Sequence, residues 1–398
     1  MGDFNLSVIL DAIRRSGEGL SRVELAAVVG LAPQTVSNIC RRLLEQELII
    51  EAGKEGSGPG KPRTILRLNP HGMYAVGVHL DPAATSYALL DLAGNLIRAD
   101  QHVTDSSGRP ELSIAEMGRR IGDLVRDAGI EESRVAGVGV ATPGPIDWRQ
   151  GTVVDPPHLP GWHRVPLRAA LAEASGLPVL LDKDVTAAAV AEMWAGGASG
   201  TGSFVFFYIG TGLGCGLVLN DEVMRGTTGN AGEIGHIVAD PDGLPCDCGR
   251  RGCISVSCMP EALVAEAREL GVLPAVGGDA ESLRNQLAGL GRAASAGDKA
   301  ARGILDRSAM RVACAVSVVT NLLDVQRVVF GGPFWSALAE HYLSRLPALV
   351  EQGSVTSGVH SIEVVGTGVG EEIGAIGAAC LVLESRLGPH AAKLLLAD

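Results

Sequence analysis

The sequence predicts an α/β protein that begins with a separate small helical module. The chain has 398 residues, and 46% of them are hydrophobic. A chain of this length exceeds what one hydrophobic core usually organises, so two or three domains are expected. From residue 72 onward, strand-like apolar runs alternate with helical segments, which is typical of α/β architecture. The first 70 residues hold 9 basic and 8 acidic side chains, whereas the rest hold 24 and 37. This asymmetry indicates a distinct module over residues 1–70.

Composition excludes several classes of function. A net charge of −12 does not suit a chain that coats nucleic acid along its length, so any DNA contact must be local. No apolar run approaches the roughly 20 residues that span a bilayer, and the start of the chain has no secretory signal pattern. Eight cysteines are too few for a disulfide scaffold. We therefore expect a cytoplasmic protein with reduced thiols.

The N-terminal module reads as three helices. Apolar residues from Leu6 to Ile13 repeat at helical spacing, and glycines follow. Ser21 and Glu24 form a capping-box pattern that starts a second helix, which ends near Gly30. A third helix starts at Pro33, although Ala32 is a weak N-cap, and its buried stripe is Val36, Ile39, Leu43 and Leu44.

The opposite face of the third helix is polar and basic, as expected of a helix-turn-helix that enters a major groove. We predict that four side chains read bases: Gln34, Thr35, Ser37 and Asn38. Four cations are expected to contact phosphates or a minor groove: Arg41, Arg42, Lys61 and Arg63. The last two belong to a glycine-rich wing between strands at 48–51 and 64–68. The alternative is a protein-interaction module, since winged helices also serve that purpose, but the polar recognition face argues against it.

The remaining chain places polar groups at the ends of strands. The strand over 135–140 runs into the turn 142–145, and the strand over 177–181 runs into Asp182-Lys183-Asp184 and an alanine-rich helix. Such strand ends mark a cleft in α/β proteins. The strand over 203–209 enters the glycine turn 210–216, whose bare backbone suits a phosphate. Taken alone, this turn is weak evidence for a phosphate site, because glycine turns often serve only to permit close packing.

Three thiols gather in eight residues at Cys246, Cys248 and Cys253. The intervening glycines permit the sharp turns that aim three thiolates inward, which leaves one ligand missing for a tetrahedral metal site. The alternative is ordinary buried cysteines or a redox pair. The other thiols are expected in the core: Cys40, Cys215, Cys258, Cys314 and Cys380.

The segments 210–216, 229–236 and 246–253 closely resemble the signature of the ROK family, which comprises sugar kinases and transcriptional repressors. The resemblance runs nearly the whole chain and includes segments 60–62, 142–145, 158–162, 176–179, the helix at Asp184 and 328–332. It implies a two-lobed actin-like (ribonuclease-H-like) ATPase fold with a sugar cleft and, in the repressors, a DNA-binding domain. The implied parts are a winged helix-turn-helix over 1–70, a first lobe over 72–185 completed by the C-terminal helix 371–398, and a second lobe over 186–370.

The resemblance also implies a metal ligand and a set of sugar contacts. The family's fourth metal ligand maps onto His236, which completes a Cys3His structural zinc site that shapes the ligand pocket near Glu233. The implied ligand-binding residues are Gly144, Lys183, Asp184, Glu233, His236 and Ser255.

Two departures from the family pattern shape the functional prediction. The phosphate turn Asp-x-Gly-Gly-Thr reads His79-Leu80-Asp81-Pro82-Ala83 here, which puts a negative charge at Asp81 and removes a donor N–H at Pro82. We therefore interpret the kinase activity as lost, so that the protein is no enzyme and Asp184, the match to the family's catalytic Asp, only holds a sugar hydroxyl. In the sugar pocket, the usual Asn-Asp pair is Lys183-Asp184, and a glutamate that accepts from vicinal hydroxyls is Ser255. Lys183 suits an anionic or altered ligand, or it pairs with Asp182 or Asp184.

Together these observations predict a sugar-responsive transcriptional regulator, a repressor rather than an activator. It is expected to bind double-stranded operator DNA as a homodimer or homotetramer, because two-fold operators need two recognition helices. We expect that ligand binding between the lobes closes the cleft and that this closure moves the DNA-binding arms. Two alternatives stay open: a working ATP-dependent sugar kinase with a DNA-binding domain, and a regulator controlled by a protein partner.

Overall fold

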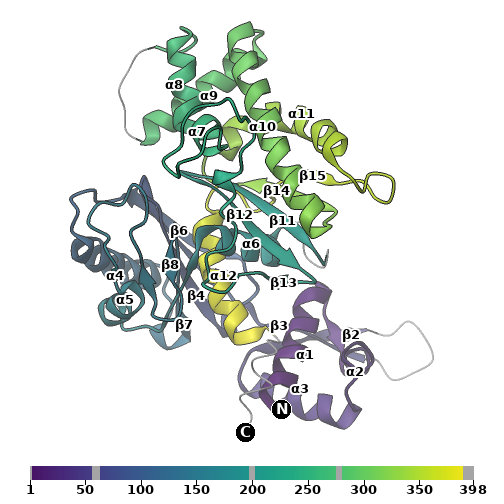
Figure 1. The fold of residues 1–398 in the computed structure, drawn as a ribbon. Helices are drawn as coiled ribbons and strands as arrows, with labels where there is room; N and C mark the ends of the chain where they lie inside the picture. The colour runs from purple at the N-terminus through teal and green to yellow at the C-terminus, as the bar shows by residue number, and fades with distance from the viewer. Residues whose placement is uncertain (1, 56–62, 197–201, 275–279, 389–398) are drawn as a thin grey trace.

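The computed structural model describes residues 2–55, 63–196, 202–274 and 280–388 and shows an N-terminal arm attached to a two-lobed body (Figure 1). The described part of the arm contains three helices and a sheet of strand order β1-β3-β2. Its elements are α1 (Gly2–Ser16), β1 (Leu20–Ser21), α2 (Arg22–Val29), α3 (Pro33–Glu45), β2 (Ile49–Glu55) and β3 (Arg63–Leu68). The 3-10 turn η1 (Pro70–Gly72) leads into the body.

The helix ends in the arm follow the sequence pattern. The Ser21 hydroxyl accepts the Glu24 backbone N–H at 3.4 Å, and the Glu24 carboxylate accepts the Ser21 N–H at 2.8 Å. Gly30 ends α2 in the left-handed conformation at φ 68°, and Ala32 caps α3 without a side-chain hydrogen bond. Strands β2 and β3 form the expected wing hairpin. The two-residue strand β1 is too short for a sequence pattern to show.

The first lobe is built on a five-stranded sheet of order β10-β7-β4-β5-β6. Strands β10, β7 and β4 run parallel, whereas β4, β5 and β6 run antiparallel. The strands are β4 (Tyr74–Leu80), β5 (Ala84–Asp91), β6 (Leu96–Val103), β7 (Val135–Thr142) and β10 (Val179–Lys183). Helices α4 (Pro110–Asp127) and α5 (Leu167–Ser175) cover its outer face, and β8 (Ile146–Asp147) pairs with β9 (Thr152–Val153) beside it. Strand β6 has no apolar pattern that would predict it from the sequence, because this edge strand is mostly exposed.

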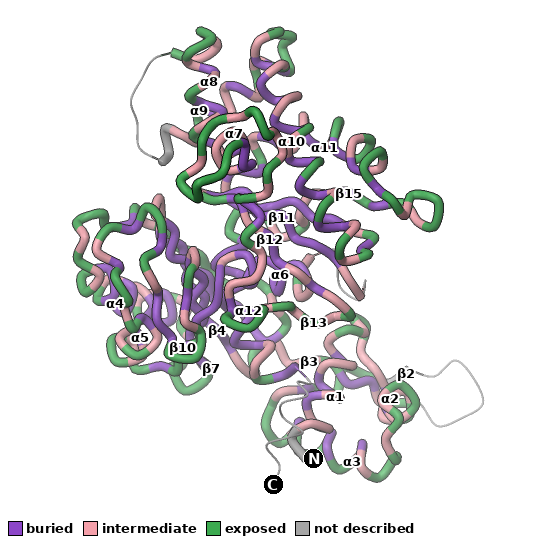
Figure 2. The backbone as a smooth tube through the Cα atoms, in the orientation of Figure 1, coloured by how far each residue is buried: buried purple, intermediate pink, exposed green. Residues whose placement is uncertain are grey.

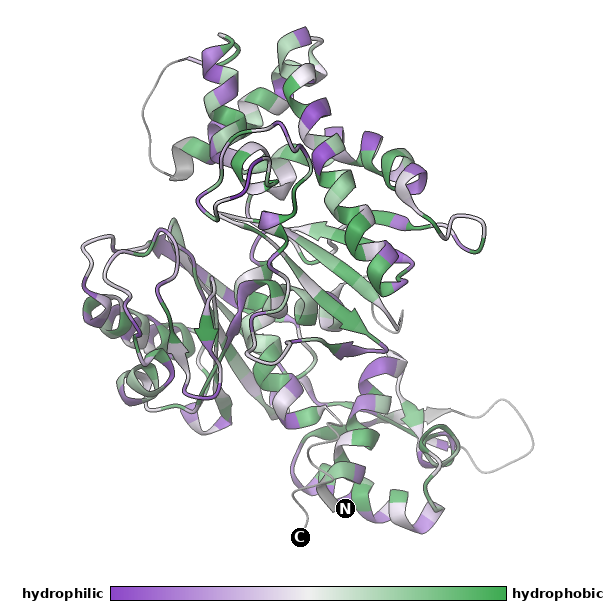
Figure 3. Ribbon diagram, in the orientation of Figure 1, coloured by the Kyte–Doolittle hydropathy of each residue, from purple (hydrophilic) through white to green (hydrophobic). Residues whose placement is uncertain are grey.

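The second lobe has its own five-stranded sheet of order β13-β12-β11-β14-β15. The glycine turn 210–216 lies at the β11–β12 hairpin, and β14 and β15 run parallel to β11. The strands are β11 (Phe204–Ile209), β12 (Leu213–Leu219), β13 (Glu222–Val223), β14 (Arg327–Gly331) and β15 (Glu363–Gly366). The helices that cover its outer face are α7 (Ser255–Cys258), α8 (Pro260–Glu269), α9 (Ala280–Ser295), α10 (Lys299–Leu323) and α11 (Trp335–Gly353). Figure 3 shows hydrophobic residues along the strands of both sheets.

Two buried helices, α6 (Asp184–Ala195) and α12 (Ile373–Leu387), lie between the two sheets (Figure 2). Helix α12 packs on β4 and β7 of the first lobe, and α6 packs on α12 and on β12 of the second lobe. A Cβ added at Gly77 would lie only 1.9 Å from the Ala375 carbonyl oxygen, and one added at Gly377 would lie 2.0 Å from the Ala187 carbonyl oxygen. Glycine therefore permits the close approach of strand to helix and of helix to helix.

The hydrophobic core of the arm is continuous with this inner layer. Ile9, Leu10 and Ile13 of α1 belong to the same cluster of buried side chains as Ala187 of α6 and Leu383 of α12. Among the described helices, no single one is long and apolar enough to cross a membrane. Only α2 and α3 together meet the length and composition criteria, and they are bent by 117° at the turn between them.

The cysteines outside the 246–253 loop are buried with one exception. Cys40, Cys215, Cys258 and Cys380 lie in the core as predicted, but the same prediction is wrong for Cys314, which is exposed. Helix α10 buries the face that carries Ala313 and Val316. At 3.6 residues per turn, Cys314 falls on the opposite face.

Candidate functional site

A small cavity lies between the lobes, where the ends of β7, β10 and β11 meet. Its volume is about 90 Å³. Four of the six predicted ligand-binding residues line it, namely Gly144, Lys183, Asp184 and Glu233, while the described positions of His236 and Ser255 lie outside its lining. The remaining lining residues are Pro143, Pro157, His158, Val185, Tyr208, Thr211, Gly212, Leu213 and Gly214.

Sequence reasoning missed three polar side chains of this cavity: His158, Tyr208 and Thr211. Thr211 carried a signal because it interrupts the glycine turn, and His158 because it begins segment 158–162 of the family resemblance. Tyr208 carried none. His158 and Thr211 also line a neighbouring cavity of about 410 Å³ against α8 and α9. The space beside the small cavity is therefore larger than the cavity itself.

Lys183 is bound inside the cavity wall. Its side chain is 3% exposed, and its ammonium group donates to the Glu233 carboxylate and to the Ala231 carbonyl oxygen. The carboxylate of Asp182 instead accepts a hydrogen bond from Arg225 at 2.7 Å. The expected partners Asp182 and Asp184 are thus replaced by Glu233, which lies 50 residues further along the chain. Glu233 keeps the larger exposure of the pair, at 59%.

Asp184 begins α6 at the base of the cavity. Burial raises the pKa of Asp184 to about 7, and the negative charges of Asp81 and Glu233 act in the same direction. The Lys183 ammonium group and the Val185 N–H, which donates to the carboxylate at 2.7 Å, lower the pKa. Near neutral pH this carboxyl group is therefore poised between its acid and its carboxylate form.

The β4–β5 turn, which carries the altered phosphate pattern, is tied to the second lobe. The buried Asp81 carboxylate accepts the Thr211 hydroxyl at 2.9 Å and the Ala83 N–H at 2.8 Å. His79 and Tyr208, both buried, place the imidazole Nε2 and the phenol oxygen 3.4 Å apart. Burial lowers the pKa of His79, so this imidazole is neutral. Two side chains of the first lobe therefore contact the second lobe here: His79 at β11 and Asp81 at the glycine turn 210–216.

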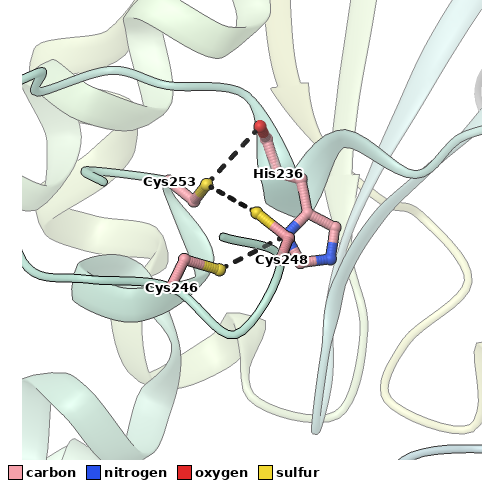
Figure 4. A group of neighbouring side chains, drawn as sticks. All are labelled: His236, Cys246, Cys248 and Cys253. Carbon is pink, nitrogen blue, oxygen red and sulfur yellow. Dashed lines mark hydrogen bonds between the residues drawn. The ribbon is translucent and has the colours of Figure 1, made fainter. Parts of the chain in front are cut away.

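The four predicted metal ligands converge (Figure 4). His236 Nδ1 lies 3.5 Å from Cys246 Sγ, and the sulfurs of Cys248 and Cys253 lie 3.6 Å apart. All four ligand atoms lie within 4.8 Å of one another. Four bonds of roughly 2.3 Å in a tetrahedron place sulfur atoms about 3.8 Å apart, so the cluster fits a metal ion of this geometry. Hydrogen bonding, first from the Cys248 backbone, lowers the pKa of Cys246 to about 6, which favours the thiolate.

This cluster is joined to the cavity through a short segment. His236 ends the 3-10 turn η3 (Ile234–His236), which directly follows Glu233. Upstream, the Gly232 carbonyl oxygen accepts the Cys215 N–H at 2.9 Å, which fixes the segment to β12. Glu233 therefore lies between the His236–cysteine cluster and a segment fixed to β12.

The recognition helix presents the predicted face to solvent. Gln34, Asn38, Arg41 and Arg42 are exposed, and Thr35 and Ser37 are half-buried. The Asn38 side-chain oxygen accepts a hydrogen bond from Arg41 at 3.0 Å, and Arg63 lies 3.7 Å from Glu24. Lys61 lies outside the described residues.

A two-lobed body of the actin-like sugar-kinase type with a winged helix-turn-helix arm defines a class in which carbohydrate recognition and DNA binding share one chain. The chain belongs to the ROK family, whose model matches residues 76–385, and a winged helix-turn-helix DNA-binding model matches residues 8–50.

Relatives with both repressor and kinase names are similar to this chain. The xylose repressor of Caldicellulosiruptor bescii is 24% identical over 372 residues, which cover 92% of each chain. The xylose repressor of Bacillus subtilis is 28% identical over 65% of this chain and 67% of its own length. A further relative, from Caldicellulosiruptor sp. (strain Rt8B.4), matches over 63% of its length, less than two thirds. The glucokinase of Thermotoga maritima is 31% identical over 79% of this chain and 98% of its own length.

Solved structures support the same fold. A ROK family transcriptional regulator described as a homologue of the E. coli MLC protein has a TM-score of 0.81 at 24% identity and covers 98% of this chain and 97% of its own. The ROK hexokinase of Thermus thermophilus has a TM-score of 0.64 at 30% identity over 77% of this chain and 97% of its own.

Proposed function

We propose that this protein is a sugar-responsive transcriptional repressor. The observation that carries the proposal is the presence, on one chain, of an exposed recognition helix and a polar cavity between two lobes. The names of the xylose repressors that it resembles support the same assignment. A role on operator DNA implies a cytoplasmic location and a two-fold assembly that presents two recognition helices.

The proposed regulator has no phosphotransferase activity. Phosphoryl transfer needs backbone donors and a bound metal ion at the nucleotide phosphates. Here the buried Asp81 carboxylate accepts from Ala83 and Thr211, and its negative charge repels a phosphate. His79 stands where the family pattern has the acid that organises the nucleotide-bound metal. Asp184 is assigned to hold a sugar hydroxyl.

We assign zinc to the Cys3His cluster. Three thiolates and one imidazole form the donor set of closed structural zinc sites. When bound, the ion would hold the 246–253 loop to His236, so that Glu233 and its partner Lys183 keep their place in the cavity wall. The ion has no role in chemistry under this proposal.

The effector is a neutral sugar rather than an anionic one. Lys183 is the cation expected to meet an anionic ligand, but Glu233 already neutralises it. The ligand hydroxyl groups then donate to the carboxylates of Asp184 and Glu233. Pentoses and hexoses are both candidates, since the relatives' names include xylose and glucose.

The test combines DNA selection with sugar titration. Duplexes bound by the purified full chain are selected from a random library, and their affinity is measured with and without D-xylose, D-glucose and N-acetyl-D-mannosamine. The proposal expects sequence-specific binding that one sugar weakens at least about 5-fold, the lower range of allosteric coupling. Selection that yields no shared sequence would refute the DNA-binding role.

A second candidate function is a working sugar kinase that also binds DNA. It is favoured by Asp184, whose pKa near 7 suits a general base. ATP-dependent phosphorylation across the same sugars discriminates between the two. Turnover that the Asp184→Asn variant abolishes would establish the kinase, whereas the repressor proposal expects none.

A further inference from the structure

One side chain at the end of α6 joins the arm to the body. The Arg14 guanidinium carbon of α1 lies 4.4 Å from the centroid of the Trp194 ring, within the range of a cation–π interaction. The indole N–H of Trp194 donates to the Glu384 carboxylate of α12 at 2.7 Å. Trp194, which belongs to α6, therefore contacts both α1 of the arm and α12 of the body.

The Arg14 side chain is held in place for this contact. Its guanidinium group pairs with Asp11, one turn earlier on α1, at 2.7 Å, and the side chain is only 11% exposed. Trp194 packs against the cluster of buried side chains that the arm and the inner layer share, which includes Ile13 and Leu383. Because this contact is largely shielded from water, it is stronger than an exposed ion pair.

The other end of α6 forms the sugar cavity. Asp184, the first residue of this helix, and Lys183, which precedes it, both line the cavity. Trp194 follows Asp184 by ten residues of this helix, so at 1.5 Å per residue roughly 15 Å separate the cavity from Trp194. One rigid element thus reaches from the ligand site to the DNA-binding arm.

Helix α6 has no space to move independently of its neighbours. A Cβ added at Gly216 of β12 would lie 2.3 Å from the Val185 carbonyl oxygen, and one added at Gly377 of α12 would lie 2.0 Å from the Ala187 carbonyl oxygen. The second-lobe sheet therefore contacts α6 on one side and α12 contacts it on the other. A shift of β12 relative to the first lobe must displace α6 or lose this packing.

We propose that α6 transmits sugar occupancy to the arm, with Trp194 as the residue that positions α1. The inference rests on the proposed repressor function and specifies how it is regulated. Sugar bound at Asp184 moves α6 together with β12, and the displacement of Trp194 shifts Arg14 and the recognition helix attached to it. The two states then differ in DNA affinity, as allosteric coupling requires.

Two further ion pairs join the arm to the body and do not include Trp194. Arg15 pairs with Asp221 at 3.2 Å, and both side chains are 36% exposed. Arg134 pairs with Glu47 at 3.2 Å, with exposures of 42% and 64%. Exposed pairs of this kind contribute little to stability. Arg15 also pairs with Asp11, the partner of Arg14, and Asp221 follows β12, which lies on the proposed route. The pair of Arg134 with Glu47 shares neither feature and offers the control for the route through Trp194.

The experiment measures coupling rather than affinity. The full-length variants Trp194→Ala, Trp194→Phe and Arg14→Gln are compared with the control Arg134→Gln. All are measured with the selected duplex and whichever of D-xylose, D-glucose and N-acetyl-D-mannosamine acts on the wild type. The wild type and the control are expected to show about 5- to 150-fold coupling between sugar and DNA. Trp194→Ala and Arg14→Gln are expected to reduce it below about 2-fold while each ligand still binds alone. Trp194→Phe, which keeps a ring face but loses the N–H, is expected to fall between these values.

Two results would overturn the inference. One is full coupling in both Trp194→Ala and Arg14→Gln. The other is an equal loss in Arg134→Gln, which would mean that any loosening of the arm uncouples the sites. Hydrogen exchange in the wild type tests the same route without a sugar: binding of the duplex should change amide exchange within residues 185–196, and an unchanged rate there contradicts the inference. If no sugar alters DNA affinity while this exchange does change, the proposed sugar response fails and the contact through α6 stands.

Discussion

His79, near the end of β4, and Asp81, in the turn that follows, depart from the phosphate pattern of the ROK family. Both side chains are buried. Both reach second-lobe side chains, Tyr208 and Thr211 respectively. These two residues therefore add contacts between the lobes, and the negative charge of Asp81 helps to raise the pKa of Asp184.

Asp184 should make stability depend on pH. An aspartate has an unfolded-state pKa of about 4, and in the folded protein burial raises the Asp184 value to about 7, so the native state holds this proton more tightly. The stability contribution is complete below about pH 4 and is lost as the pH rises through about 7. The Asp184→Asn variant removes this titration. Its free energy of unfolding in urea should fall less than that of the wild type between about pH 5 and pH 8.

The matched control for this titration is Glu269→Gln, which removes an exposed carboxylate at the end of α8. It is expected to keep the wild-type pH profile. Parallel profiles for the wild type and Asp184→Asn would show that Asp184 does not titrate in this range.

The 246–253 loop shows what sequence spacing predicts well and what it leaves out. Three cysteines close together in the chain must lie close in space, and the structure brings them within reach of His236. The capping box at Ser21 is similarly local and was predicted with its partner. In contrast, nothing local links Lys183 to Glu233 or Trp194 to Arg14, because these pairs depend on the packing of distant segments. The edge strand β6 was missed since it lacks a buried face.

Removal of the metal should unfold the loop and weaken the whole second lobe. The purified protein is expected to carry about one zinc ion per chain, measured by elemental analysis. Cys248→Ser should lose the ion and lower the melting temperature by about 5 °C or more, because structural metal binding stabilises the fold. The control Cys314→Ser changes an exposed thiol on α10 and should keep both the zinc and the melting temperature. Equal zinc content in the two variants would contradict the assigned ligand set.

The exposed face of α3 predicts two kinds of DNA contact. Asn38, whose side-chain oxygen accepts a hydrogen bond from Arg41, is proposed to read a base edge. Asn38→Ala should therefore weaken binding by about 1–3 kcal/mol and relax specificity at one position. Arg42→Gln should weaken binding to all duplexes alike. It should also reduce the slope of log affinity against log salt concentration by about one, because one phosphate contact is lost. Affinities for the selected duplex and its single-base variants, measured over a series of salt concentrations, separate these effects. A uniform loss for Asn38→Ala would reassign this side chain to the DNA backbone.

The arm and the body share one hydrophobic core. Buried side chains of α1, among them Ile9 and Ile13, belong to the cluster that includes Ala187 of α6 and Leu383 of α12. By comparison, an arm held only by exposed pairs such as Arg15 with Asp221 would be free to reorient. A shared core ties the position of the recognition helix to the packing between the lobes, which is what a sugar-dependent repressor needs.

The shared core also predicts how the molecule unfolds. If the arm were an independent domain, calorimetry would resolve its transition from that of the body, whereas a continuous core makes the arm and the inner layer unfold together. We expect one transition for these parts in the full chain. Ile13→Ala, which opens a cavity where α1 meets the inner layer, should lower the midpoint of that whole transition, with a loss of about 2–5 kcal/mol. The matched substitution Val28→Ala, at an exposed position of α2, should leave it unchanged. A separate early transition that alone responds to Ile13→Ala would show that the arm is an independent unit. Coupling through α6 would then have to act between two parts that unfold separately.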